Sequence, residues 1–458
     1  MSARKVTTAL LVNVCRLVVA LTFIFSGYVK AIDPLGTQYK LQDYLEAWQL
    51  AAYVPDDVTL LASVALGGAE FCLGVLLLFA IRRRLVTRLL LLLMAVMTPL
   101  TLWLAIANPI EDCGCFGDAV VLTNWETFYK NVVLLAAVIL LFKRPLAMPR
   151  FISRSNQWLV VTYTIVFILA SSSYCLYTLP TFDFRPYHVG ANIKAGMEIP
   201  EGAKQPEFET TFILEKNGQR KEFTLDNYPD STWTFVDSKT VQTEEGYVPP
   251  IHDFFIQTTD GSEDITDSVL NHKGYAFMLV SPHLEKADDS NFGEIDAIYE
   301  YSLVHGYPFY ALTASTDDAI AHWREITGAE YNFFLTDETT LKTIIRSNPG
   351  LLLIKDGTII GKWSHNDLPE LDYQSADLEH TAYGTAPEHS TADKTSKILL
   401  WYILPLLLLT FADRTWKFTQ WIKKKEHSNK IYRFFKGKKN MRKKIVAGNW
   451  KMNMNLQD

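Results

Sequence analysis

Long apolar segments are the feature that most constrains the fold of this chain of 458 residues. A helix needs about 20 mostly apolar residues to cross roughly 30 Å of hydrocarbon. Five early segments meet this requirement, and a sixth, shorter one has nearby aromatic residues typical of membrane interfaces. The sequence therefore predicts a membrane protein built on a bundle of about six helices, in contact with lipid. The expected spans are Thr7–Tyr28, Val58–Ala80, Leu85–Ala107, Asn124–Phe142, Trp158–Leu179 and Ile398–Phe411; a buried soluble helix is the alternative for the last.

Basic residues gather at one end of the predicted bundle. Arg82–Arg84 precede the third span, Lys143 and Arg144 follow the fourth, and Lys423–Lys425 follow the sixth. Because Lys and Arg mark the cytoplasmic side, we expect both termini in the cytoplasm and the polar segment 181–394 on the periplasmic side of the inner membrane. The net charge of −6 averages over these unlike regions, and the sequence indicates no nucleic-acid partner.

The polar segment after the fifth span alternates strand-like and helix-like patterns. Tyr275–Ser281 is continuously apolar, which favours a central strand covered on both faces. Lys355-Asp356-Gly357 predicts a hairpin turn, because Asp-Gly supplies the positive φ that tight hairpins need. We expect an α/β domain here, preceded by a β-rich segment at 181–250. The other expected elements are helices at Glu294–Val304, Asp317–Ile326 and Thr339–Ile345, and strands at Phe309–Thr313 and Asn332–Leu335.

This order of elements, with Pro349 just before the hairpin, resembles the thioredoxin-like fold of membrane-tethered and peroxiredoxin-type proteins. The resemblance covers about Ile251–Trp363 and implies a cis peptide bond at Pro349. The family's Cys-X-X-Cys belongs after the first central strand, where this chain has Ser281-Pro282-His283-Leu284. A domain without a thiolate cannot exchange disulfides, so we expect a binding or scaffold domain. His283 is either a solvated loop residue or a functional remnant.

Two of the five cysteines, Cys113 and Cys115, lie in the loop between the third and fourth expected spans. The predicted topology places this loop on the oxidising side, where disulfides persist. A disulfide across one residue is strained, and Gly114 gives the backbone the freedom it needs. Since strained disulfides are easily reduced, these cysteines are the candidate catalytic redox pair. Cys175, at a similar depth, is the candidate resolving cysteine.

Less reactive roles for these cysteines remain open. Cys113 and Cys115 could be two unreactive thiols, or one of them could form a structural bridge to another cysteine. Two thiolates without a nearby histidine fall short of the usual four zinc ligands, so we predict no metal site. Cys15 and Cys72 lie in the inner halves of their spans, toward the predicted cytoplasmic side, and are expected to be packing residues.

Two ionisable residues lie near the middle of the expected spans, Arg16 in the first and Glu70 in the second. Such a residue costs about 2.5–3.5 kcal/mol on insertion scales, so it usually faces the bundle interior and has a partner. We hypothesise that Arg16 and Glu70 approach each other, either as a structural ion pair or in a proton- or quinone-linked role. The sequence contains no recognisable haem or flavin site, so quinone is the cofactor considered.

Three motifs in the first 142 residues carry a further resemblance. They are Phe25–Pro34 (FSGYVKAIDP), Gly67–Gly74 (GGAEFCLG) and Asp112–Gly117 (DCGCFG). In this order they resemble the DoxX/MauE (methylamine-utilisation) family of four-helix membrane proteins, over about Thr7–Phe142. The resemblance implies a membrane redox process. The MauE branch is associated with disulfide formation in exported proteins, alongside a thioredoxin-like partner.

The C-terminal segment 441–453 is similar to the start of triosephosphate isomerase, and Asn449 and Lys451 match that family's substrate-binding residues. That barrel needs about 250 residues, and the family's catalytic His and Glu would fall beyond Asp458. We therefore expect no isomerase activity, an unstructured tail, and an origin in read-through or in a fused or truncated reading frame.

These patterns favour a membrane protein with a thiol–disulfide or electron-transfer-linked role at the outer face of the cytoplasmic membrane. Its partners would be exported proteins or a redox protein. The alternative is a non-enzymatic envelope scaffold that binds a partner protein. The expected parts are a four-helix membrane domain (1–145), a fifth span (146–180), the β-rich segment (181–250), a thioredoxin-like domain without Cys-X-X-Cys (251–395), a sixth span (396–412), a basic cytoplasmic tail (413–440) and the isomerase-like fragment (441–458).

Overall fold

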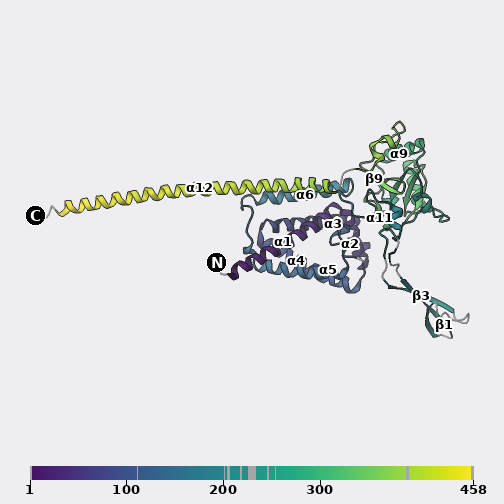
Figure 1. The fold of residues 1–458 in the computed structure, drawn as a ribbon, viewed down its shortest axis with the longest axis horizontal. Helices are drawn as coiled ribbons and strands as arrows, with labels where there is room; N and C mark the ends of the chain where they lie inside the picture. Colours follow the sequence, from purple (N-terminus) through teal and green to yellow (C-terminus); the bar gives the residue numbers. More distant parts are fainter. Residues whose placement is uncertain are drawn as a thin grey trace.

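The computed structural model shows a helical bundle, an α/β domain at one end of it, a small separate sheet and a long C-terminal helix (Figure 1). In the described part of the chain, six helices are long and apolar enough to cross a membrane, as the sequence predicted. The chain is therefore a multi-pass membrane protein. The structure describes residues 3–110, 112–200, 202–203, 207–216, 219–224, 234–244, 247–252, 254–387 and 391–454.

Close packing between the first two spans organises the bundle. A Cβ atom added to Gly27 would lie 2.2 Å from the backbone nitrogen of Phe71, and one added to Gly74 would lie 2.7 Å from that of Ile24. Small residues at these positions let the two backbones approach each other, as is common between membrane helices. The spans of the bundle are α1 (Ala3–Ile32), α3 (Asp56–Leu78), α4 (Arg83–Ala107), α5 (Asn124–Lys143) and α6 (Gln157–Tyr177).

An additional helix, α2 (Pro34–Ala47), lies between α1 and α3 and was not predicted. Its start follows standard capping chemistry: the Asp33 carboxylate accepts a hydrogen bond from the Gly36 N–H at 2.9 Å, and Pro34 occupies the first helical position. This helix lies where the α/β domain meets the bundle. We call this the domain end of the bundle, and the opposite end, where α4 begins and α5 ends, the basic end.

The α/β domain has a six-stranded sheet with the order β4-β7-β6-β5-β8-β9. β5 is parallel to β6 and antiparallel to β8, and β6 is parallel to β7. Helices cover both faces, so the fold is thioredoxin-like. The strands are β4 (Gln257–Thr258), β5 (Tyr275–Ser281), β6 (Phe309–Thr313), β7 (Phe333–Leu335), β8 (Gly350–Lys355) and β9 (Thr358–Ser364), and the helices are α8 (Thr266–Leu270), α9 (Phe292–His305), α10 (Asp317–Thr327) and α11 (Glu338–Ile344).

The central strand β5 is buried along its whole length, as its continuous apolar sequence predicted. Successive side chains alternate between the two faces: Phe277 packs in the same core as Ile298, whereas Met278 packs in the same core as Leu341. The predicted hairpin is also present, because Asp356 and Gly357 join β8 to β9 with φ of 50° and 75°. The Asn348–Pro349 peptide bond is cis, as the resemblance implied.

Two regions extend beyond these parts. Within 181–250 the structure describes α7 (Ile193–Met197) and a separate sheet of β1 (Glu207–Lys216), β2 (Gln219–Thr224) and β3 (Thr234–Glu244) in the order β2-β1-β3. The sixth span belongs to α12 (Thr391–Met454), which continues into the isomerase-like segment. The expectation of an unstructured tail was therefore wrong. Lys, Arg and Met favour helix, and no proline follows Pro405 to interrupt it.

Candidate functional site

The structure brings the two loop cysteines together at the domain end of the bundle. The Sγ atoms of Cys113 and Cys115 lie 3.0 Å apart, at hydrogen-bonding distance and not bonded to each other. Gly114 between them has φ of +64°, a conformation that side-chain-bearing residues rarely adopt. Cys113 is buried, and Cys115 is partly exposed. The loop therefore presents two adjacent thiols, and we call residues 112–118 the dithiol loop.

The hydrogen bond between the two thiols gives them different pKa values. Donation toward Cys115 and burial raise the pKa of Cys113 above that of an ordinary cysteine. The same bond lowers the pKa of Cys115, and the positive charges of Lys130 and Lys30 lower it further. When the first proton leaves, the negative charge therefore resides on Cys115, with Cys113 as its hydrogen-bond donor.

A buried polar network between α1 and α3 binds the backbone of the dithiol loop. Lys30 of α1 forms an ion pair with Glu70 of α3 at 2.9 Å, and both side chains are about 6% exposed. The Lys30 ammonium also donates to the backbone carbonyl of Cys115 and to the Ser26 hydroxyl. The Ser26 oxygen lies 2.7 Å from both Glu70 and the Cys115 carbonyl. Two spans and the dithiol loop are thus connected through one buried cation, which sequence analysis missed.

The hypothesis that Arg16 approaches Glu70 was wrong. Arg16 donates to the carbonyls of Leu77 and Leu78, where α3 ends, and to Pro149. It therefore satisfies the last carbonyls of a helix at the basic end. At 1.5 Å per residue, Arg16 lies about 21 Å along α1 from Lys30, the actual partner of Glu70.

The remaining cysteines lie in the helices. Cys175 is buried in α6, and its sulfur lies 3.3 Å from the Thr181 hydroxyl. Among the described contacts, none joins Cys175 to either loop thiol, so its resolving role stays a prediction. Cys15 and Cys72 are partly buried and pack against apolar clusters of the bundle.

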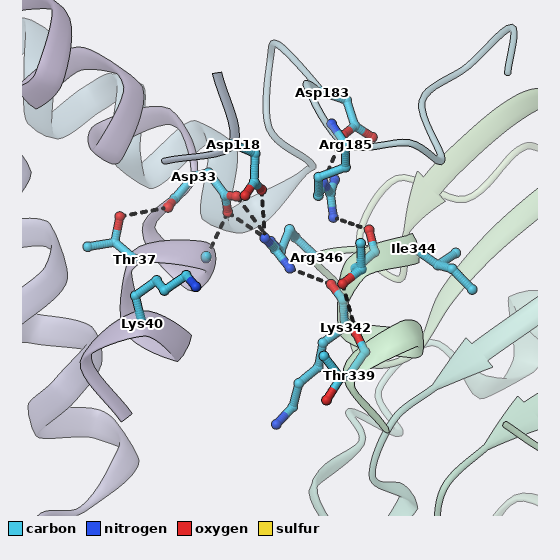
Figure 2. Close-up of polar contacts among 12 residues, drawn as sticks. Asp33, Thr37, Lys40, Asp118, Asp183, Arg185, Thr339, Lys342, Ile344 and Arg346 are labelled. Carbon is cyan, nitrogen blue, oxygen red and sulfur yellow. Dashed lines mark hydrogen bonds and ion pairs between the residues drawn. The ribbon is translucent and has the colours of Figure 1, made fainter. Parts of the chain in front are cut away.

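The thioredoxin-like domain is attached to the same loop through Arg346 (Figure 2). This side chain, 8% exposed, lies 3.1 Å from Asp33 at the end of α1 and 3.2 Å from Asp118 in the dithiol loop. A second ion pair joins Lys286 to Asp56 at 2.6 Å. Arg346 lies three residues before Pro349. The edge of the domain where thioredoxins carry their active site therefore faces the dithiol loop.

The positions where the thioredoxin family carries its thiols form a hydrogen-bonded polar cluster here. The Ser281 hydroxyl lies 2.6 Å from the Asn348 side-chain oxygen, and the Asn348 amide donates to the His283 carbonyl at 2.8 Å. The His283 ring lies 2.9 Å from the Glu338 carboxylate. His283 therefore lies in a partly exposed loop, with its side chain 33% exposed, and has an acidic partner on α11.

A cavity of about 260 Å³ lies between the domain and the bundle. Its lining includes Asp112 and Gly114, which flank Cys113, and Arg346 on the opposite side. Lys40 of α2 also lines it and forms an ion pair with Asp112 at 3.0 Å. Within the residues that the structure describes, no cluster of three or more His, Cys, Asp or Glu residues is arranged to hold a metal ion.

Fold and site together define a multi-pass membrane protein with a dithiol loop beneath a thioredoxin-like domain. Residues 8–144 match the family described as methylamine utilisation protein MauE, so the bundle is similar to that family. Residues 208–245 match a family described as a domain of unknown function. The DoxX name and the isomerase-like tail stay predictions.

No curated protein matches the chain. A solved structure of a candidate protein disulfide isomerase from Bacteroides thetaiotaomicron is similar at 16% identity, over 25% of this chain and 77% of that one, with a TM-score of 0.22. The thioredoxin-like assignment rests on strand order and connectivity in this chain.

Proposed function

We propose that the chain is a membrane thiol–disulfide oxidoreductase whose redox centre is the Cys113/Cys115 pair. The observation that carries this proposal is the 3.0 Å separation of the two sulfurs in a loop held by a buried cation. The similarity of the bundle to the MauE family supports a membrane redox role. The side of the membrane is part of the proposal: the basic end faces the cytoplasm and the dithiol faces outward.

The reaction is a two-electron exchange. A thiolate of an exported protein attacks Cys113 of the oxidised pair, because the positive charges of Lys130 and Lys30 stabilise the Cys115 thiolate that leaves. The second substrate thiolate then breaks the mixed disulfide. The substrate loses two electrons and two protons, and the loop cysteines become two thiols. A quinone, which becomes quinol on taking up two electrons and two protons, is the class of membrane acceptor that would reoxidise them.

The thioredoxin-like domain has no cysteine and cannot relay electrons itself. We propose that it positions the substrate next to the loop, since its active-site edge contacts Asp118 through Arg346. The second candidate function is a non-enzymatic scaffold. The hydrogen-bonded polar cluster at His283, where the family has reactive thiols, favours that role for this domain.

Thiol trapping in intact membranes tests the proposal. A mass-tagged alkylating reagent is applied before and after mild oxidant and reductant, with Cys113→Ser and Cys115→Ser as variants and Cys72→Ser as the matched control. We expect reversible tagging of two cysteines in the parent and the control. After the oxidant is added, Cys115→Ser should accumulate mixed disulfides between Cys113 and substrate thiols, because the oxidant takes up the two electrons and the Cys115 thiolate that would reverse the bond is absent.

Loop cysteines that stay reduced, or stay permanently oxidised, under every condition would refute the oxidoreductase role. The scaffold function makes the opposite prediction. Replacing both cysteines would then leave the function of the protein in cells unchanged, whereas deleting residues 251–387 would abolish that function.

A further inference from the structure

A second cavity, of about 570 Å³, lies at the basic end of the bundle between the start of α4 and the end of α5. Arg84 and Arg88 line it from α4, and Lys143 and Arg144 line it from the end of α5. Among the residues that the structure describes, no acidic side chain lines this cavity. The dithiol chemistry does not involve it, because the dithiol is at the opposite end of the spans.

These four cations have no counter-charge within the described part of the chain, where none of them forms an ion pair. The neighbouring Arg83 is different, because it donates to the carbonyls of Leu146 and Met148 and so holds the turn that forms one wall. Arg83 thus stabilises the wall of the cavity, whereas the other four cations line the cavity itself. Four uncompensated positive charges around one concavity favour an anion there.

The surroundings of the cavity indicate what kind of anion it binds. Phe142, in the last turn of the α5 span, and Leu146 line it and are 40% and 63% exposed. Leu85, in the first turn of the α4 span, is 46% exposed. The four cations therefore lie beside exposed apolar side chains at the end of the α5 span and the start of the α4 span. This combination fits an amphiphile better than a free anion.

We propose that this cavity binds the headgroup of an anionic phospholipid, with the phosphate between the α4 arginines and Lys143/Arg144 and an acyl chain along Phe142 and Leu146. The guanidinium groups can donate to phosphate oxygens in a bidentate manner. Basic pockets between membrane helices bind such lipids on the cytoplasmic side. The site is independent of the proposed redox function.

Native mass spectrometry of the full-length protein, released from nanodiscs with equal phosphatidylglycerol and phosphatidylcholine, tests the proposal. We expect the parent to retain phosphatidylglycerol selectively. Arg84→Gln/Arg144→Gln should lower this retention by about tenfold or more, since each cation near the surface contributes to anionic-lipid binding. Lys423→Gln/Lys424→Gln is the matched control, because it removes the same charge from α12 outside the cavity, and it should bind as the parent does.

Ala147→Trp separates the cavity from a diffuse positive surface, because it fills the concavity and keeps every charge. We expect it also to lose phosphatidylglycerol while eluting as the parent does in size exclusion. Inorganic phosphate at millimolar concentration should not displace the lipid. Three results would each overturn the proposal. They are unchanged retention of phosphatidylglycerol in Ala147→Trp, equal losses of the lipid in the Arg84/Arg144 and Lys423/Lys424 variants, and displacement of the lipid by free phosphate.

Discussion

At the scale of single residues, the buried ion pair of Lys30 and Glu70 acts on the dithiol loop. Burying two charges costs free energy that their attraction only partly returns, so such a pair is weak evidence for a role in stability. Here the ammonium also binds the Cys115 carbonyl. The charges on the two partners act on the Cys115 thiolate with opposite signs, since Lys30 lowers its pKa and Glu70 raises it.

Substitution of the two partners should therefore move the pKa of Cys115 in opposite directions. Lys30→Met removes a positive charge that favours the thiolate, so the pKa rises and alkylation at neutral pH slows. Glu70→Gln removes a negative charge that opposes it, so the pKa falls and alkylation persists at lower pH. The measurement is the alkylation rate of Cys115 from pH 5 to 9 in reconstituted protein, against the value of about 8.5 for a free cysteine.

Lys417→Met, on α12 away from the loop, is the control and should leave the pH profile unchanged. Equal shifts of the Cys115 pKa, of the same sign in Lys30→Met and Glu70→Gln, would mean that both variants only disturb the structure of the loop. The electrostatic account would then be wrong, whatever the redox activity of the pair.

At the scale of elements, the glycine contacts between α1 and α3 fix which residues face each other. The contact of Gly27 with Phe71 places the next helical turn of α1, with Lys30, beside Glu70. Four residues are about one turn, so Ser26 and Lys30 share that face of α1. The register of two helices therefore decides the partner of the buried carboxylate.

Gly27→Ala should destabilise the bundle, because the new Cβ would lie 2.2 Å from a backbone atom that cannot move alone. Overpacking of this kind costs about 1–3 kcal/mol, and separation of the helices would also strain the ion pair of Lys30 and Glu70. Thermal unfolding in nanodiscs measures the loss. Gly68→Ala is the matched control, since its nearest neighbour is a side-chain atom of Ile168 at 3.9 Å. A loss in Gly68→Ala as large as in Gly27→Ala would refute this explanation.

The same register explains what the sequence could and could not predict. The spans, β5 and the Asp356-Gly357 turn were predictable because each depends on a local pattern of apolar residues or of φ preference. The partner of Glu70 was not predictable. The sequence indicates only how far each residue lies from the end of its own span, and it does not show how far α3 extends past the end of α1. Gly67 and Gly74, which contact α1, were visible in the sequence. Their counterparts on α1 could be identified only from the packed helices.

At the scale of the whole molecule, the thioredoxin-like domain and the bundle meet through a few charged contacts that the sequence did not predict. Arg346 reaches Asp33 and Asp118 across about 310 and 230 positions of the chain, respectively, and no local pattern predicts such distant pairs. The two ion-paired contacts differ in burial. Arg346 is 8% exposed, whereas Lys286 and Asp56 are 64% and 52% exposed. Because exposed pairs contribute about 0–1 kcal/mol, docking depends mainly on Arg346.

Arg346→Ala should therefore loosen the domain and expose the dithiol loop. It leaves Asp33 and Asp118 without their cation and removes part of the wall of the 260 Å³ cavity beside Gly114. We expect alkylation of Cys115 and hydrogen exchange in residues 112–118 to become several-fold faster, because the loop loses a contact that opposes local opening. Lys286→Ala is the matched control and should change neither rate measurably. Equal rates in the parent and Arg346→Ala would mean that the domain does not restrict access to the loop. Substrate would then reach the cysteines by a path that docking does not control.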